Sequence, residues 1–187
     1  MSQLSKLPLK SSILKFIIMH VLGRKGRRLK YGILADDFTG AGDVGLQFRR
    51  SGFKVTIITK LDVSLAVEAV KGAGAIVLDT ETRNASGGEA YKTVRRAVEI
   101  MKESRVELAY KKIDSTLRGN IGSELDAVLD ATIKKLSLVA PALPEAQRAT
   151  VGGYHLVRWT PIEQTEFAKD PLKPVKESNL VKLISLE

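Results

Sequence analysis

A polar stretch in the middle of the chain carries the residue types that a binding site needs. Residues 111–120, with the sequence KKIDSTLRGN, combine three cations, a carboxylate, two hydroxyl groups and a glycine. A mostly apolar run at 106–110 precedes them and alternates as a strand does, and helical spacing from Leu125 to Leu136 follows them. Ser123 and Asp126 fit a capping box at the start of that helix. The stretch is therefore predicted to be a strand-to-helix turn, and a solvated loop of surface charges is the alternative.

Three other polar clusters follow predicted strands. Asp36 and Asp37 end the first strand, residues 79–84 (DTETRN) end the third, and residues 145–148 lie beyond the fifth. The carboxyl ends of parallel strands meet at one edge of a sheet, so the clusters are expected to converge on one crevice. Scattered solvated loops would instead place such residues at both edges.

The residue types in these clusters suit a ligand that carries both a carboxylate and hydroxyl groups. Cations pair with a carboxylate, while side-chain carboxylates and hydroxyls bind sugar hydroxyls. A carboxylate beside a substrate hydroxyl can also orient the attacking oxygen and take its proton, as a sugar-type kinase requires. The candidate cations are Arg83, Lys112 and Arg118, and the candidate partners of hydroxyl groups are Asp36, Asp37, Asp114, Ser115 and Thr116.

The elements that position these clusters alternate along the chain. Strands are predicted at 31–35, 54–59, 75–79, 106–110 and 136–140, and helices at 43–50, 62–71, 87–104, from about 123 to 136, and at 179–186. The strands are almost wholly apolar and are separated by helices. This pattern predicts an α/β fold with an open, mainly parallel sheet and helices on both faces, Rossmann-like and three-layered. Residues 152–157 predict a short strand or hairpin, and we expect the fold to be incomplete at the C-terminus because the chain stops on a helix just begun.

One glycine pattern suggests a different ligand. Residues 40–45 (GAGDVG) fit a dinucleotide-binding fingerprint, and Asp62 lies at the spacing of a ribose-binding acid. Two carboxylates, Asp36 and Asp37, precede the first glycine and would repel a pyrophosphate unless a metal bridged them. We therefore expect Gly42 and Gly45 to serve a tight turn and close helix–strand packing.

Charge separates the first 30 residues from the rest. The chain has a formal charge of +9, and residues 1–30 hold eight lysines and arginines and no acid, which leaves 22 basic and 21 acidic residues elsewhere. We predict a basic N-terminal extension at 1–30 and one domain at 31–187. The apolar run at 13–22 is too short to span a bilayer. Cysteine is absent, which favours a cytoplasmic protein, and we expect neither a nucleic-acid nor a membrane partner.

Several motifs occur in a characteristic order. They are ADDFTGA at 35–41, LDTETR at 78–83, KKIDSTLRGN at 111–120, APALP at 140–144 with RAT at 148–150, and TEFAKDP at 165–171. Together, from Tyr31 nearly to the end of the chain, they resemble the N-terminal, substrate-binding domain of the four-carbon acid sugar kinase family. Several motifs in one order are far more specific than any one of them.

The resemblance implies a sugar-acid-binding domain at 31–187 without the C-terminal nucleotide-binding domain of the family. The implied ligand is a sugar acid of the threonate, erythronate or 3-oxo-tetronate type. ATP and Mg would be bound mainly by the missing domain, so no metal site is expected in this chain. A separately encoded nucleotide-binding domain is the implied partner. The alternatives are a standalone sugar-acid-binding module and an inactive truncated remnant, and a homo-oligomer is left open.

The resemblance maps Asp36, Arg83 and residues 112–115 onto substrate-binding positions. Combined with the residue chemistry, it gives three candidate catalytic residues, Asp36, Asp37 and Asp114. The predicted substrate-binding set is Asp36, Asp37, Thr39, Gly40, Arg83, Lys112, Ile113, Asp114, Ser115, Thr116, Arg118 and Gly119.

Overall fold

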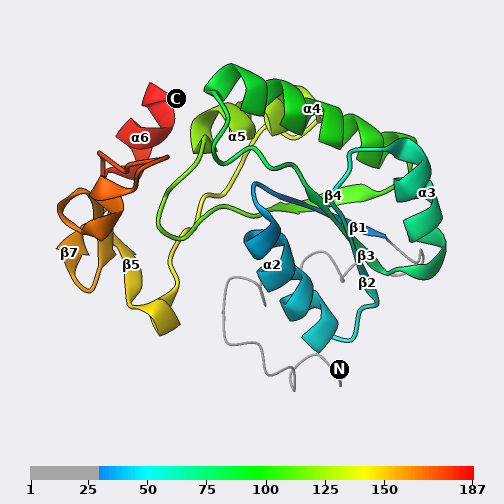
Figure 1. Cartoon of the computed structure of the whole chain (residues 1–187), viewed down its shortest axis with the longest axis horizontal. Helices are drawn as coiled ribbons and strands as arrows, with labels where there is room; N and C mark the ends of the chain where they lie inside the picture. Colours follow the sequence, from blue (N-terminus) through cyan, green and yellow to red (C-terminus); the bar gives the residue numbers. More distant parts are fainter. Residues whose placement is uncertain (1–29) are drawn as a thin grey trace. The chain divides into compact units, whose positions relative to one another are not determined.

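The computed structural model describes residues 30–187 (Figure 1), and nearly all of the predicted basic extension lies outside this range. The described residues form two compact units. The first, called the sheet unit, comprises residues 30–79 and 99–112. The second, called the hairpin unit, comprises residues 80–98 and 113–187. No helix in the described part of the chain is long and apolar enough to cross a membrane.

The sheet unit is built on four parallel strands. These are β1 (Tyr31–Ala35), β2 (Val55–Ile58), β3 (Ala75–Asp79) and β4 (Glu107–Lys111), in the order β2-β3-β1-β4. The predictions for β1 and β3 match residue for residue, and those for β2 and β4 are within one residue at each end. An open parallel α/β sheet is therefore confirmed.

The predicted fifth strand at 136–140 is wrong. The segment forms no strand, and Leu136 and Leu138 are 86% and 78% exposed. Apolar composition favours a strand only where a neighbouring strand is available for pairing. This segment pairs with none of the described strands.

Helices cover both faces of the sheet. Helix α2 (Phe38–Arg50) contacts β1, β2 and β3, and α3 (Val63–Gly72) contacts β2 and β3 from the opposite face (Figure 1). Helix α2 begins five residues before its predicted start at Asp43. The reason is Asp37, whose side chain caps the helix by accepting a hydrogen bond from the Gly40 N–H at 2.8 Å.

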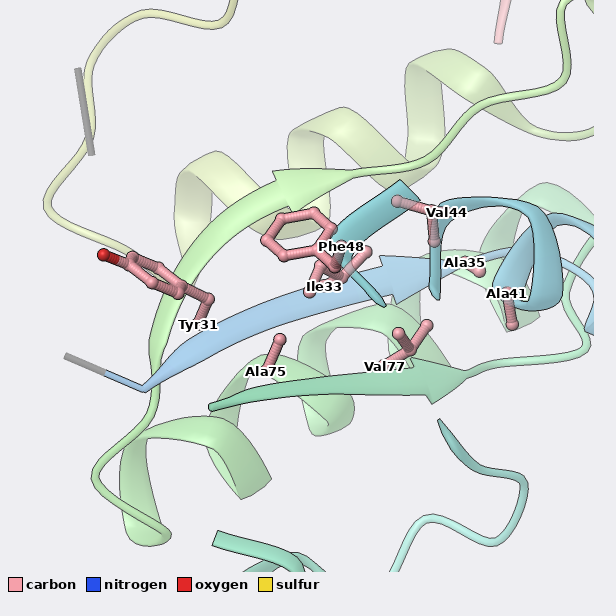
Figure 2. Packing of buried hydrophobic residues seen from close by; sticks show 8 residues of the cluster. All are labelled: Tyr31, Ile33, Ala35, Ala41, Val44, Phe48, Ala75 and Val77. Atoms are coloured by element: carbon pink, nitrogen blue, oxygen red, sulfur yellow. The ribbon is translucent and has the colours of Figure 1, made fainter. Parts of the chain in front are cut away.

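The core between α2 and the sheet is made by alternate residues of the strands. Figure 2 shows them facing the helix: Tyr31, Ile33 and Ala35 of β1, Ala75 and Val77 of β3, and Ala41, Val44 and Phe48 of α2. On the other face, a Cβ on Gly32 would lie 2.6 Å from Met101 Sδ, so glycine lets the end of α4 (Gly87–Glu103) approach β1 closely. Both faces of the two central strands, β1 and β3, are buried, which explains their almost wholly apolar sequence.

The helix predicted at 87–104 forms as α4, and five apolar residues at helical spacing along it are buried: Ala90, Val94, Ala97, Val98 and Met101. Helix α5 (Ile121–Asp130) ends earlier than predicted, and Ile133 is 98% exposed. The predicted capping box is wrong as well. Asn120 is the N-cap, and Ser123 lies inside the helix, where its hydroxyl donates to the Glu187 backbone carbonyl.

The rest of the hairpin unit is irregular. Strand β6 (Tyr154–Val157) lies within the short strand or hairpin predicted at 152–157, and it pairs with β5 (Arg148–Val151), which was not predicted, and with β7 (Thr160–Pro161). The 3-10 turns are η2 (Pro144–Ala146), η3 (Ile162–Gln164) and η4 (Glu166–Lys169), and the chain ends with α6 (Leu180–Leu186). The apolar core of this unit joins α5, β6, η3 and α6 through Leu117, Ile121, Leu125, Val157, Ile162, Val175, Leu180 and Leu183.

Candidate functional site

In the sheet unit, the carboxyl ends of β1, β3 and β4 lie next to one another. Ala35 is paired with Asp79, and the Lys112 N–H donates to the Leu34 carbonyl at 2.7 Å. Asp36 and Asp79 are 2% and 1% exposed. Polar residues from three strand ends therefore share one edge of this sheet, as expected for the binding edge of an open α/β fold.

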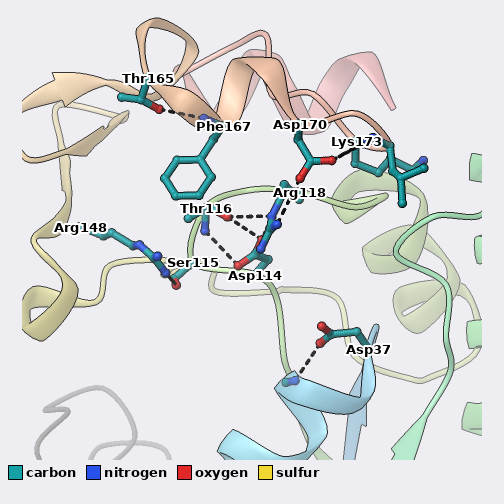
Figure 3. A network of polar contacts seen from close by, with 12 residues as sticks. Asp37, Asp114, Ser115, Thr116, Arg118, Arg148, Thr165, Phe167, Asp170 and Lys173 are labelled. Atoms are coloured by element: carbon teal, nitrogen blue, oxygen red, sulfur yellow. Dashed lines mark hydrogen bonds and ion pairs between the residues drawn. The ribbon is translucent and has the colours of Figure 1, made fainter.

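The first turn of α2 adds Asp37, Thr39 and Gly40 to this edge. A Cβ on Gly40 would lie 2.6 Å from Asp37 Oδ1 and 3.5 Å from Lys112 Cγ, so only glycine fits beside the capping carboxylate. Figure 3 shows the cap that Asp37 makes, whereas Thr39 is exposed. The cap and the close approach fix the backbone of this turn.

The glycine fingerprint does not form a phosphate-binding loop. Gly40 and Gly42 lie within α2, and the Gly40 N–H at its start is bonded to the Asp37 carboxylate. Asp62 caps α3 by accepting from the Leu65 N–H at 3.1 Å, a structural role. These residues do not fit a nucleotide phosphate. A Cβ on Gly45 would lie 3.5 Å from Ile57 Cδ1, which agrees with the expected close helix–strand packing. Nothing lies within 4 Å of a Cβ on Gly42, so the expectation for Gly42 is wrong.

In the hairpin unit, the loop after β4 holds a polar network (Figure 3). Asp114 Oδ2 accepts from Arg118 Nε at 2.6 Å and from Thr116 Oγ1 at 2.6 Å, and Oδ1 accepts from the Thr116 N–H at 3.2 Å. Arg118 Nη1 also donates to Asp170 Oδ2 at 3.2 Å. Arg118 thus joins the loop to a carboxylate 52 residues further along the chain.

This network keeps Asp114 ionised. Burial by itself would raise the pKa of Asp114, but hydrogen bonds from Thr116 and Arg118 and the charges of Arg118 and Arg83 outweigh burial and lower that pKa. Burial would lower the pKa of the Arg118 guanidinium, yet its bond to Asp114 raises that pKa. Asp114 and Thr116 are 7% and 0% exposed, so both side chains make their contacts with other protein groups rather than with solvent.

The turn that carries Arg83 is anchored to the start of α5. Asn120 Nδ2 donates to the carbonyls of Thr82 and Ala85 at 2.8 and 3.1 Å, and Thr82 Oγ1 donates to Glu124 Oε1 at 2.5 Å. Arg83 is half-buried, and its charge acts on both Asp114 and Arg118. The structure thus gathers Arg83, Asp114, Thr116 and Arg118 in one unit.

The remaining predicted residues of this loop have different surroundings. Ile113 packs against the apolar core of the hairpin unit, and Gly119 has φ +119°, a conformation that favours glycine. Ser115 is half-buried, and its hydroxyl accepts a hydrogen bond from Arg148 Nη1 at 2.5 Å. Phe167 lies near both arginines, with its ring centroid 5.8 Å from Arg118 Cζ and 5.6 Å from Arg148 Cζ.

The predicted site set left out Arg148, Phe167 and Asp170. All three lie in the RAT and TEFAKDP motifs, so the sequence marked the segments that contain them but did not indicate which residues they contact. Sequence spacing alone could not show that these segments meet residues 114–118. Among residues 30–187, no group of three His, Asp or Glu side chains is arranged to hold a metal ion.

The fold and these loops match a known class of domain. A family model described as a sugar-binding N-terminal domain matches residues 31–187. The chain belongs to the four-carbon acid sugar kinase family.

Three similar proteins illustrate this membership. A D-threonate kinase from Salmonella typhimurium is 38% identical over 160 residues, 85% of this chain and 37% of the relative. A D-erythronate kinase from Heliobacterium modesticaldum is 38% identical over a region that covers 83% of this chain and 35% of the length of that kinase. A crystal structure from Bordetella bronchiseptica, a domain-swapped dimer with bound citrate, has a TM-score of 0.78 at 35% identity and covers 83% of this chain and 39% of that one. The chain therefore spans little more than a third of the length of these relatives.

Proposed function

We propose that residues 31–187 bind a four-carbon sugar acid of the threonate, erythronate or 3-oxo-tetronate type for phosphorylation on a hydroxyl group. The match to a sugar-binding N-terminal domain over residues 31–187 carries this proposal. Relatives named for kinases of D-threonate and D-erythronate support the ligand class. Citrate in the Bordetella structure supports an affinity for small hydroxy acids. Cytoplasmic location is part of the proposal.

Among the residues named from the sequence, some are proposed to contact the ligand and others to hold the loop in shape. Arg83 and Lys112 supply positive charge for the acid group, because each is half-buried and lies in or beside a polar loop. Asp36 and Asp37 accept hydrogen bonds from ligand hydroxyl groups, and the hydroxyl groups of Thr39 and Ser115 donate to ligand oxygens. Asp114, Thr116 and Arg118 bond mainly to one another, so their contribution is to hold the loop in shape.

The proposed base is Asp36 or Asp37 rather than Asp114. A general base works best when its pKa is near the working pH, and the pKa of Asp114 is lowered below its ordinary value. Both Asp114 oxygens already accept hydrogen bonds from the protein. Asp114 would therefore be a weak base, and both of its oxygens are already engaged in hydrogen bonds with the protein.

ATP and Mg would be supplied by a nucleotide-binding domain, which we propose to be a separate partner of this chain. The glycine-rich segment at 40–45 does not fit a phosphate, because its residues are helical and the Gly40 N–H already donates to the Asp37 carboxylate. Most of the rate of phosphoryl transfer comes from positioning and charge stabilisation around the phosphates. The 187-residue chain is therefore expected to bind the sugar acid and not to consume ATP on its own.

Isothermal titration calorimetry of the 187-residue chain tests this proposal. D-threonate and D-erythronate should bind saturably, and at least about tenfold more tightly than the matching four-carbon alditols, which lack the carboxylate, because a charged hydrogen bond is lost. Butanoate, which lacks the hydroxyl groups, serves as the second control. Equal affinities for acids and controls, or ATP-dependent phosphorylation by this chain alone, would contradict the proposal.

A further inference from the structure

Ser115 is held from two sides by the β5–β6 hairpin. Arg148, the first residue of β5, donates from Nη1 to Ser115 Oγ at 2.5 Å. His155 of β6 hydrogen-bonds through Nε2 to the Ser115 backbone carbonyl at 2.8 Å. Both the side chain and the main chain of Ser115 are thus fixed by one hairpin, within a single unit.

The chemistry of the partners fixes the direction of each hydrogen bond. An arginine guanidinium has only donors, so Ser115 Oγ must accept from Arg148, and its own hydroxyl hydrogen is not used in that contact. A carbonyl oxygen only accepts, so His155 carries its proton on Nε2, and its Nδ1 then accepts from Thr150 Oγ1 at 3.0 Å. The Ser115 hydroxyl hydrogen therefore points away from Arg148 and is available for donation to another acceptor.

The neighbouring hydroxyl shows the contrast. Thr116 Oγ1 donates to Asp114 Oδ2 and accepts from Arg118 Nε at 3.1 Å, and Thr116 is 0% exposed. Its donor and an acceptor are both used inside the protein. Ser115 is half-buried, so of these two adjacent hydroxyl groups it is the one with a donor for a ligand.

The structure around Arg148 and His155 holds both in place. The Arg148 guanidinium lies 5.6 Å from the Phe167 ring centroid, within the range of a cation–π contact. His155 is 0% exposed, and burial lowers its pKa, which favours the neutral ring that this pair of hydrogen bonds requires. Arg148 and Phe167 also line a pocket of about 310 Å³ together with Arg158 and Glu166, so open space lies beside Arg148.

We propose that Arg148 and His155 are positioning residues that make Ser115 a dedicated hydrogen-bond donor to a carboxylate oxygen of the bound sugar acid. This inference rests on the proposed function and adds residues to it. Arg148 acts through the Ser115 side chain, and His155 acts through the Ser115 backbone. Lysine cannot replace Arg148, because a point charge on a flexible stem lacks the planar group that meets both Ser115 and Phe167.

A double-mutant cycle with D-threonate as the probe tests the inference. Arg148→Lys and Ser115→Ala should each weaken binding roughly tenfold to a hundredfold, the range for one hydrogen bond to a charged group. In the Ser115→Ala background, Arg148→Lys should have almost no further effect, because the two residues act through one contact. Arg50→Lys is the matched control, since Arg50 is exposed in the last turn of α2, and it should leave affinity unchanged.

His155 supplies the conservative rescue. Glutamine can place an N–H near the position of Nε2, so His155→Gln should keep affinity within a few-fold of the wild type, whereas His155→Ala should lose roughly tenfold or more. A structural role in folding alone would lower the melting temperature and leave the cycle additive. Additive losses of affinity, or equal losses in the glutamine and alanine variants, would overturn the inference.

The two proposals fail in distinguishable ways. If D-threonate binds and the cycle is additive, the positioning inference is overturned and the proposed function stands. If the wild-type chain binds no sugar acid, the wild-type titration already overturns the proposed function and with it a ligand role for Ser115. The melting temperatures of the four proteins of the cycle (wild type, the two single variants and the double variant), measured without ligand, then show whether the Arg148–Ser115 contact exists. Additive shifts in melting temperature would overturn that contact as well.

Discussion

Asp114→Asn should destabilise the chain markedly although the two side chains have nearly the same shape. Asp114 Oδ2 accepts from two donors, Arg118 Nε and Thr116 Oγ1, each at 2.6 Å, and Oδ1 accepts from the Thr116 N–H. An asparagine presents an NH₂ group in place of one of these oxygens. Whichever way the amide is turned, at least one buried donor then faces another donor.

The magnitude follows from burial. Breaking a fully buried ion pair costs about 3 to 5 kcal/mol, and losing a hydrogen bond to a charged group costs about 1.5 to 3 kcal/mol. The Arg118 side chain is 29% exposed and keeps Asp170, which lessens the cost of removing its first partner. We therefore expect a loss of about 2 to 3 kcal/mol, which corresponds to a fall in melting temperature of roughly 5 to 10 °C for a chain of this size.

Urea unfolding followed by circular dichroism, together with calorimetry, measures this loss. Asp126→Asn is the matched control, because Asp126 is exposed on α5, and its effect should stay within about 0.5 kcal/mol. An Asp114→Asn variant as stable as the Asp126→Asn control would refute the reasoning, since it would mean that the network contributes nothing to folding.

Three further predictions follow from the same contacts. Gly40→Ala should lower the free energy of unfolding by about 1 to 2 kcal/mol, because its Cβ would meet the capping carboxylate at 2.6 Å. Gly42→Ala should raise it by about 0.5 to 1 kcal/mol, and thermal unfolding of both variants measures the two effects. The pKa of Asp114 is lowered from 3.8, so its contribution to stability is complete above that pH. It is lost as the pH falls through the lower folded pKa, so the stability gap between wild type and Asp114→Asn should narrow only as the pH falls below 3.8 in acid titrations. Arg83→Ala should weaken D-threonate binding by about 2 to 5 kcal/mol, while calorimetry of Lys134→Ala, an exposed residue, should show almost no change.

The regular part of the fold could be predicted because its signals are local. The apolar runs at 31–35 and 75–79 are buried on both faces, so composition alone marked their ends. The short strand or hairpin predicted at 152–157 contains β6, and Gly152 and Gly153 adopt φ of +58° and +86° in the turn before it. The start of α2 was missed because a capping carboxylate begins the helix before its apolar stripe does.

Long-range contacts set the limit for the rest. Residues 136–140 have the composition of a strand, and composition does not say whether a neighbouring strand is available. For the site, the polar loops could be found but not the partner of each side chain. Arg118 was considered as a partner for a ligand carboxylate, and the structure pairs it with Asp114 and with Asp170, far along the chain. Sequence chemistry gives the kind of group an arginine binds and leaves open whether that group is a ligand or the protein itself.

The central claim is that this chain binds a four-carbon sugar acid through its polar loops. Amide chemical shifts of the ¹⁵N-labelled 187-residue chain, followed during titration with D-threonate, test it most directly. We expect saturable shifts at Asp36, Lys112 and Ser115, and none at the exposed residues Asp126 and Lys134. A spectrum that D-threonate leaves unchanged, or shifts confined to residues outside the polar loops, would contradict the claim.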